Sequence, residues 1–183
     1  MVREISAGGV VIRRRDGAWW MAAIEPPTEP ARTVVRRSKP ASKSESTGEI
    51  PRHSVAWRKR VLALPKGLVD PGEKPVETAI REVYEETGVT ADVVAKLDDI
   101  KYVYSRSWGD GQRVFKIVSF YLMRYLSGRI NHISPKMRIE VARARWIPLE
   151  DAPKMLAYKG EKQMAQRAQD YLIAHAELLS ADP

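Results

Sequence analysis

The chain has 183 residues, of which 44% are hydrophobic, so its length and composition suit one domain with a substantial core. The absence of cysteine excludes disulfides and thiolate metal ligands and leads us to expect a cytoplasmic protein, and no apolar run approaches the ~20 residues of a membrane-spanning helix. The net charge is +8, but nine lysines and arginines against only two glutamates fall in residues 31–60, which argues for one basic segment rather than a general nucleic-acid surface.

The first elements that the sequence predicts are two strands and a long loop. Residues 4–13 and 18–25 read as strands, and Asp16-Gly17 between them is typical of a hairpin turn. At about residues 27–56 the chain is rich in Pro, Ser, Thr, Arg and Lys without periodicity, so we expect a basic insertion. This composition favours a flexible solvated loop. The alternatives are an arm that holds a polyphosphate over an active site, and a surface for RNA or an acidic partner. The basic side chains concerned are Arg32, Arg36, Arg37, Lys39 and Lys43.

The rest of the chain predicts strands and helices in mixed order. A short strand over residues 61–67 precedes a helix over 75–87. Residues 148–156 predict a short helix, and about 160–179 a long amphipathic one. The other stretches that read as strands are residues 91–97, 100–106, 113–125 and 142–147. We therefore expect a single mixed α and β domain over residues 1–183.

The helix over 75–87 carries an unusual cluster of acidic residues. Pro75 suits its first position, and Gly88 suits a left-handed residue that ends it. Glu82, Glu85 and Glu86 are three and four residues apart, so their carboxylates lie along one side of the helix and repel one another. A hard divalent cation such as Mg²⁺ would offset this repulsion. The alternative is a solvated acidic face, which is common on exposed helices.

The acidic cluster belongs to a longer pattern that resembles a known signature. Residues 67–89, GLVDPGEKPVETAIREVYEETGV, match the Nudix signature Gly-x5-Glu-x7-Arg-Glu-U-x-Glu-Glu-x-Gly-U, with U aliphatic, at every fixed position. The chain is therefore similar to the Nudix hydrolases. The resemblance implies an α/β/α sandwich around a mixed sheet. It also implies hydrolysis of a phosphoanhydride bond in a nucleoside diphosphate derivative, with Mg²⁺ as cofactor and Mn²⁺ as a substitute.

The resemblance also assigns roles to the residues of the signature. It implies that Glu82, Glu85 and Glu86 bind the metal and act in catalysis, with Glu85 or Glu86 polarising the attacking water. Which glutamate is the base stays open. The carbonyl of Gly67 is expected as a further metal ligand. The residues with expected structural roles are Glu73 and Arg81, as an ion pair, and Gly88, at the end of the helix.

Residues outside the signature resemble those of diadenosine polyphosphate hydrolases. Lys66 lies in the sequence Pro-Lys-Gly that enters the signature, as in that group. By the same resemblance, Glu140 completes the metal site, Tyr158 stacks on a base and Lys162 binds phosphate. Glu140 could equally be a surface carboxylate, and Tyr158 could pack under the last helix. Tyr104, together with Trp108, is a candidate for a second stacking surface. Trp146 is more typical of the core.

Several functions remain open at this stage. The favoured substrate is a dinucleoside polyphosphate such as diadenosine tetraphosphate or hexaphosphate. Rival substrates are oxidised or canonical nucleoside triphosphates, ADP-ribose, diphosphoinositol polyphosphates and capped RNA. A nucleotide- or RNA-binding module without catalysis is the non-enzyme alternative, although such a module has no need for three clustered glutamates. We expect the protein to bind a nucleotide as substrate and not to associate with a membrane. Nucleic acid is a less favoured partner, and the oligomeric state stays open.

Overall fold

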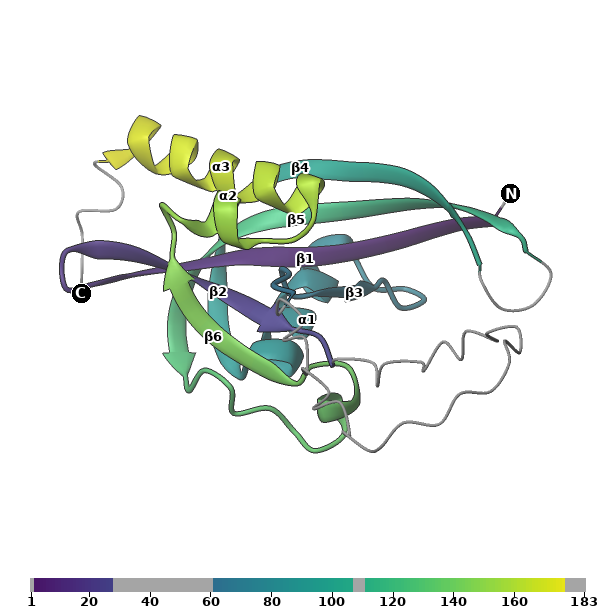
Figure 1. The fold of residues 1–183 in the computed structure, drawn as a ribbon, viewed down its shortest axis with the longest axis horizontal. Helices are drawn as coiled ribbons and strands as arrows, with labels where there is room; N and C mark the ends of the chain where they lie inside the picture. The colour runs from purple at the N-terminus through teal and green to yellow at the C-terminus, as the bar shows by residue number, and fades with distance from the viewer. Residues whose placement is uncertain (1, 28–60, 107–110, 177–183) are drawn as a thin grey trace, which may run out of the picture.

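The computed structural model describes residues 2–27, 61–106 and 111–176 (Figure 1). Apart from its first residue, the basic insertion expected at about 27–56 lies outside the described residues, and so does Trp108. Among the described residues, no helix is long and apolar enough to cross a membrane.

Six strands form one mixed sheet in the described part of the chain. They are β1 (Val2–Arg15), β2 (Ala18–Glu25), β3 (Lys66–Leu68), β4 (Val89–Ser105), β5 (Arg113–Gly128) and β6 (Arg143–Pro148). Their order across the sheet is β4-β5-β1-β2-β6, and β3 pairs with β1 beside this row. β1 is parallel to β5 but antiparallel to β2 and β3. The hairpin predicted at Asp16-Gly17 is present, because both residues have positive φ and Arg15 pairs with Ala18.

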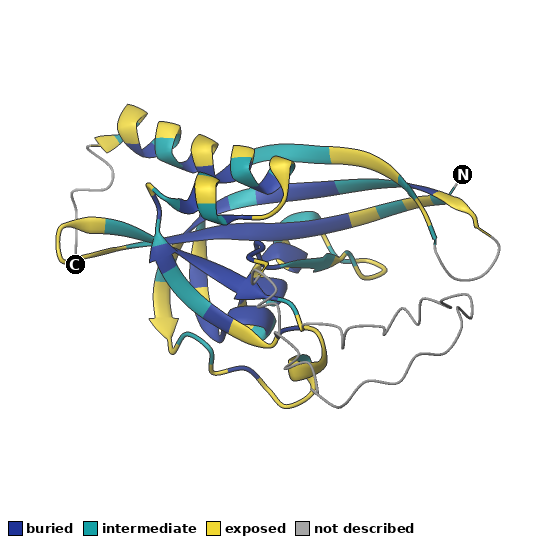
Figure 2. Cartoon of the chain, in the orientation of Figure 1, coloured by how far each residue is buried: buried dark blue, intermediate teal, exposed yellow. Residues whose placement is uncertain are grey.

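Helices cover both faces of the sheet (Figure 1). Alternate residues of β1 point to opposite faces: Val11 packs in one buried cluster with Val83 of α1 (Pro75–Thr87). Val10 packs in a second cluster with Ala168 of α3 (Lys159–Ala174) and residues of the short helix α2 (Ala152–Met155). Buried residues therefore run along the middle strands and the inner sides of the helices (Figure 2). The α/β/α sandwich expected from the sequence is confirmed.

A short bridge joins β2 to the segment that leads into β3. The backbone N–H of Ile24 donates to the carbonyl of Ala63 over 2.9 Å, and the N–H of Ala63 donates back over the same distance. Residues 61–67 are therefore not one strand as expected, since β3 begins only at Lys66. Pro65 has no N–H to offer a ladder, but its carbonyl accepts the N–H of Gly9 over 3.2 Å. This segment places Lys66 and Gly67 beside β1.

Two predicted strands, at 91–97 and 100–106, are one continuous strand, β4. The sequence between them suggests a break because Asp98-Asp99 is polar. In the structure Asp98 forms an ion pair with Arg167 of α3 over 2.6 Å, and Asp99 accepts a hydrogen bond from Ser119 of β5. Register shifts along β4 disturb the regular alternation that sequence patterns rely on. The last helix, α3, begins one residue before its expected start and ends at Ala174, short of the expected end at about residue 179; residues 177–179 lie outside the described part.

Candidate active site

Helix α1 presents the acidic cluster and has the predicted boundaries. It begins at Pro75 and ends before Gly88, which takes up a left-handed conformation with φ of 79°. Ala79 and Val83 are buried against the sheet and fix which side of the helix faces inward. Ile80, the apolar residue next to Ala79 in the sequence, lies off this side and is 42% exposed.

Glu82 and Glu86 are buried carboxylates, only 7% and 5% exposed. Glu86 accepts a hydrogen bond from the backbone N–H of Lys66 over 2.8 Å. Burial nevertheless raises the pKa of Glu86 to about 8, and the charges of Glu82 and Glu140 act in the same direction. Burial also raises the pKa of Glu82, against the opposing effect of its arginine neighbour. A further positive charge nearby would stabilise the ionised forms of Glu82 and Glu86.

Arg81 lies at the centre of a network of ion pairs. Its Nε and Nη2 atoms donate to the two oxygens of Glu73 over 3.0 and 2.9 Å, in the bidentate geometry that suits guanidinium. Its Nη1 atom donates to Glu82 over 2.8 Å and to Glu85 over 3.2 Å. The carbonyl of Leu68 accepts from Nη2 over 3.2 Å. The expected Glu73–Arg81 pair is therefore present, and Arg81 also shields two glutamates of the cluster from each other.

The Glu73 carboxylate is expected to make folding stability depend on acid pH. The hydrogen bonds from Arg81 and then from Thr78 (2.6 Å) lower the pKa of Glu73 from 4.5 to about 2. A lowered folded-state pKa stabilises the fold above about pH 4.5, and this contribution is lost as the pH falls from 4.5 towards 2. We expect Glu73→Gln to be less stable than wild type at pH 7, with the difference shrinking through that window. Urea unfolding at pH 7, 4.5 and 3 measures it. A difference that stays constant with pH would refute this origin.

Gly67 makes room for the Glu82 carboxylate. A Cβ atom at position 67 would lie 2.0 Å from Oε1 of Glu82 and 2.1 Å from its Cδ, closer than any real contact. The glycine of the signature therefore lets the β3 backbone approach the acidic cluster directly. Its carbonyl, expected as a metal ligand, belongs to the same stretch of chain.

The donors fit a divalent cation, although they are not arranged around one point. Among the described residues, no group of three or more Asp, Glu or His side chains forms a ready-made metal site. Glu82 and Glu85 turn towards Arg81 instead, and Glu86 is bonded to Lys66. The set nevertheless consists of carboxylate groups, whose oxygens are the ligands that Mg²⁺ and Mn²⁺ prefer. Glu82 and Glu86 are buried, and a cation beside them would offset the cost of their charges.

A cleft of about 750 Å³ opens beside this cluster, between the sheet and the first turn of α3. Four residues that the sequence predicts in the site line this cleft: Lys66, Glu86, Glu140 and Tyr158. Glu140 follows a short 3-10 helix at Met137–Ile139 and is exposed. The structure thus brings together residues that are far apart in the sequence. A second hollow, of about 510 Å³, lies at the far end of α3 next to Trp19 and contains none of the predicted site residues.

Some predicted site residues do not line the cleft. The Tyr104 hydroxyl donates to Glu4 over 2.9 Å near the end of β4, away from the cleft lining. Lys162 is partly buried in α3 and does not line the cleft, although its neighbours Glu161 and Gln163 do. Trp146 packs against the α1-side core, 5.6 Å from the Tyr125 ring, as expected of a core aromatic.

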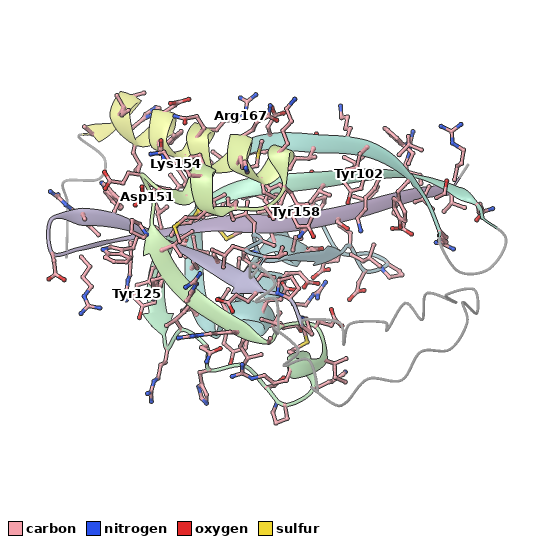
Figure 3. The ribbon with its side chains drawn as sticks, viewed as in Figure 1. Tyr102, Tyr125, Asp151, Lys154, Tyr158 and Arg167 are labelled. Carbon is pink, nitrogen blue, oxygen red and sulfur yellow. The ribbon has the colours of Figure 1, made fainter. Side chains whose placement is uncertain are left out.

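The sequence does not point to every residue that lines the cleft, and the two most relevant omissions are Tyr102 and Glu161. Tyr102 is 42% exposed and lines the cleft from β4, facing the region of Tyr158 at the start of α3 (Figure 3). Alternation along β4 places Tyr102 and Tyr104 on the same side of the strand. The strand pattern alone therefore does not tell which of the two tyrosines lines the cleft. Glu161 is 3% exposed, and no local signal in a helix marks such burial.

Comparison with known proteins places this geometry in a family. The NUDIX domain model matches residues 26–168. A putative mutator protein, MutT4, of Mycobacterium tuberculosis is 36% identical over 172 residues; the match covers 93% of this chain but 56% of the relative, so the chain spans about half the length of that protein. The asymmetrical bis(5'-nucleosyl)-tetraphosphatase of Mus musculus is 30% identical over 114 residues, covering 60% of this chain and 71% of the relative.

The fold has close counterparts among solved structures. An Ap4A hydrolase of C. elegans superposes with a TM-score of 0.58 at 18% identity, covering 93% of this chain and 98% of that structure. At this identity the likeness concerns the fold alone. The family match covers most of the chain, including α1 and its glutamates. The chain therefore belongs to the Nudix hydrolase family.

Proposed function

We propose that this chain hydrolyses a phosphoanhydride bond in a nucleoside diphosphate derivative and requires Mg²⁺ or Mn²⁺. The observation that carries the proposal is the cleft in which the buried carboxylate of Glu86 lies on the same wall as Lys66. An acidic group for a cation and a basic group for phosphate are the two components that phosphoryl transfer needs. A binding module would not need buried carboxylates whose pKa is raised.

The cation would be held by the carboxylates of the cluster. We assign this role to Glu82, Glu85 and Glu86, with the Gly67 carbonyl and Glu140 as further oxygen ligands. When bound, a divalent cation supplies charge neutralisation for the phosphates and acidifies water. The chain itself supplies a glutamate, Glu85 or Glu86, to take the proton of the attacking water.

Lys66 would stabilise the negative charge that develops on the leaving phosphate. Its Nζ atom is 2.9 Å from Glu161, and its side chain, 28% exposed, lines the cleft. Burial lowers the pKa of Lys66, but the charges of Glu161 and Glu86 outweigh this and raise it overall. Lys66 therefore stays cationic at neutral pH and available to a polyphosphate.

We propose a dinucleoside polyphosphate as the preferred substrate. Tyr102 and Tyr158 offer two exposed aromatic rings to bases, at about 1–3 kcal/mol for each stacked base. Lys66, Lys101 and Lys159 line the same cleft and suit a long, highly charged phosphate chain. The 30% identity to a mouse enzyme named as an asymmetrical bis(5'-nucleosyl)-tetraphosphatase supports the same class.

A substrate panel with product analysis tests this preference. The kcat/KM values for diadenosine tetraphosphate and hexaphosphate are compared with those for oxidised dGTP, ADP-ribose, a diphosphoinositol polyphosphate and 5'-triphosphorylated RNA. We expect a lead of at least about tenfold for a dinucleoside polyphosphate, which needs only ~1.4 kcal/mol of transition-state binding. Mass spectrometry should find ATP and AMP from diadenosine tetraphosphate. The Glu86→Gln variant, purified in parallel, measures contaminating activity.

The outcomes separate the reaction from the substrate. If oxidised dGTP or ADP-ribose leads by tenfold or more, the substrate assignment is wrong while the reaction class stands. If no phosphoanhydride in the panel is cleaved with Mg²⁺ or Mn²⁺, the proposed activity itself is wrong. Repeating the panel after deletion of residues 31–52 shows whether the basic insertion affects substrate choice.

A further inference from the structure

A buried carboxylate that the reaction does not use lies next to the cleft. Glu161 is the third residue of α3 and is only 3% exposed, although it carries a charge. Charged side chains are seldom buried to this extent unless they have partners. Its position in the first turn of a 16-residue helix favours a negative charge, because the helix N-terminus is positive. That preference accounts for a surface glutamate but not for a buried one.

Both oxygens of Glu161 bind the segment that enters the signature. One, Oε2, accepts the backbone N–H of Leu64 over 2.9 Å. The other, Oε1, forms an ion pair with Nζ of Lys66 over 2.9 Å, and this Nζ also reaches the carbonyl of Leu64 at 3.4 Å. A single side chain of α3 therefore holds both the backbone and the lysine of a segment almost a hundred residues earlier.

These contacts determine where Lys66 points. A lysine side chain has several rotatable bonds, and immobilising it costs up to about 2 kcal/mol of conformational entropy. The ion pair with Glu161 offsets this entropy loss. Both residues line the cleft, so the pair holds Nζ at the cleft wall. Tyr158, three residues earlier in the chain and at the N-terminal cap of α3, lies on the same cleft. The pair thus fixes the spacing between the phosphate-binding lysine and an aromatic wall.

We propose that Glu161 is a positioning residue, which holds Lys66 against the cleft so that the lysine meets the phosphate chain of the substrate. This inference rests on the proposed hydrolysis. Glu161 affects turnover because it positions Lys66, and not only because it keeps α3 packed on the sheet. Glutamine at this position is a sharp probe, because its single oxygen can replace only one of Oε1 and Oε2, and its NH₂ group then faces the Leu64 N–H or the Lys66 ammonium as a second donor.

A double-mutant cycle tests the inference. Glu161→Gln, Lys66→Met and the double variant are compared with wild type in kcat/KM for diadenosine tetraphosphate. We expect Glu161→Gln to lower kcat/KM by about tenfold when Lys66 is present, and by less than about twofold in the Lys66→Met background. Glu161→Asp, which keeps the charge on a shorter side chain, is expected to recover part of the loss.

A matched control separates positioning from folding. Asp98→Asn breaks the Asp98–Arg167 ion pair, which also joins α3 to the sheet but lies outside the cleft lining. We expect Asp98→Asn to leave kcat/KM within about twofold of wild type, as most exposed pairs contribute little. Melting temperatures of all variants, measured by differential scanning fluorimetry, show whether each is folded at the assay temperature.

The outcomes decide between the two roles. If Glu161→Gln lowers kcat/KM by the same factor with and without Lys66, the residue acts through the fold and the inference is wrong. If diadenosine tetraphosphate is not cleaved, the cycle is run on whichever substrate of the panel is. If none is cleaved, calorimetric binding of inorganic tripolyphosphate without metal replaces turnover: the inference then requires Glu161→Gln to weaken binding only when Lys66 is present.

Discussion

Replacing Glu86 by glutamine is expected to lower kcat/KM by more than about 100-fold. Removing a residue that only hydrogen-bonds to a metal ligand already costs up to about 100-fold, and Glu86 is assigned as a ligand itself. The carboxamide can still accept the Lys66 N–H, so the local hydrogen bond survives. It cannot supply the negative charge that a divalent cation requires. Because the buried carboxylate resists ionisation, with a pKa of about 8, its loss should leave the melting temperature unchanged or slightly higher.

A matched control for Glu86→Gln lies in the same helix. Glu77→Gln makes the same chemical change on α1, but Glu77 is exposed and only accepts the N–H of Lys74, which glutamine can also do. We expect this variant to keep wild-type turnover. Binding of Mn²⁺ in the absence of substrate, followed by calorimetry, should weaken for Glu86→Gln and not for Glu77→Gln. Near-normal turnover in both Glu85→Gln and Glu86→Gln would remove the assignment of the metal site.

Arg81→Ala is expected to damage both the fold and the reaction. It removes the bidentate pair with Glu73 and leaves buried Glu82 without its cationic neighbour. Breaking a fully buried pair costs roughly 3–5 kcal/mol, but Arg81 is 29% exposed, so we expect a loss of about 2 kcal/mol. For a chain of this size that lowers the melting temperature by roughly 4–8 °C.

Added cation and a second substitution distinguish structure from chemistry. Mg²⁺ should reduce the melting-temperature loss of Arg81→Ala, because it offsets the same glutamates. Arg81→Lys keeps the charge but not the planar fork, so only part of the stability should return. An unchanged melting temperature together with lost turnover would instead make Arg81 a group that contacts the substrate.

The sequence predicts α1 and its cluster well because their signals are local. Pro75 and Gly88 act on backbone geometry within one turn, and spacings of three and four place Glu82, Glu85 and Glu86 on one side of any helix. The central strands are likewise predicted, since the alternation of buried residues follows directly from the pleat.

What the sequence does not predict depends on long-range pairing. The continuity of β4 through Asp98-Asp99 relies on Arg167 and Ser119, which lie far away in the chain. The burial of Glu161 depends on Leu64 and Lys66, and in a helix its position alone suggests only a favourable surface charge. Such residues become visible only when the segments are brought together.

The bridge between Ile24 and Ala63 has a consequence for the rigidity of the cleft. It ties the end of β2, the second strand of the β1–β2 hairpin, to the segment that leads into β3 by two backbone hydrogen bonds. Both bridge residues also line the cleft, so the same two hydrogen bonds set the distance between these two parts of its wall. Backbone groups make these bonds, so substitutions of the Ile24 or Ala63 side chain can change the shape of the wall without moving the two segments apart.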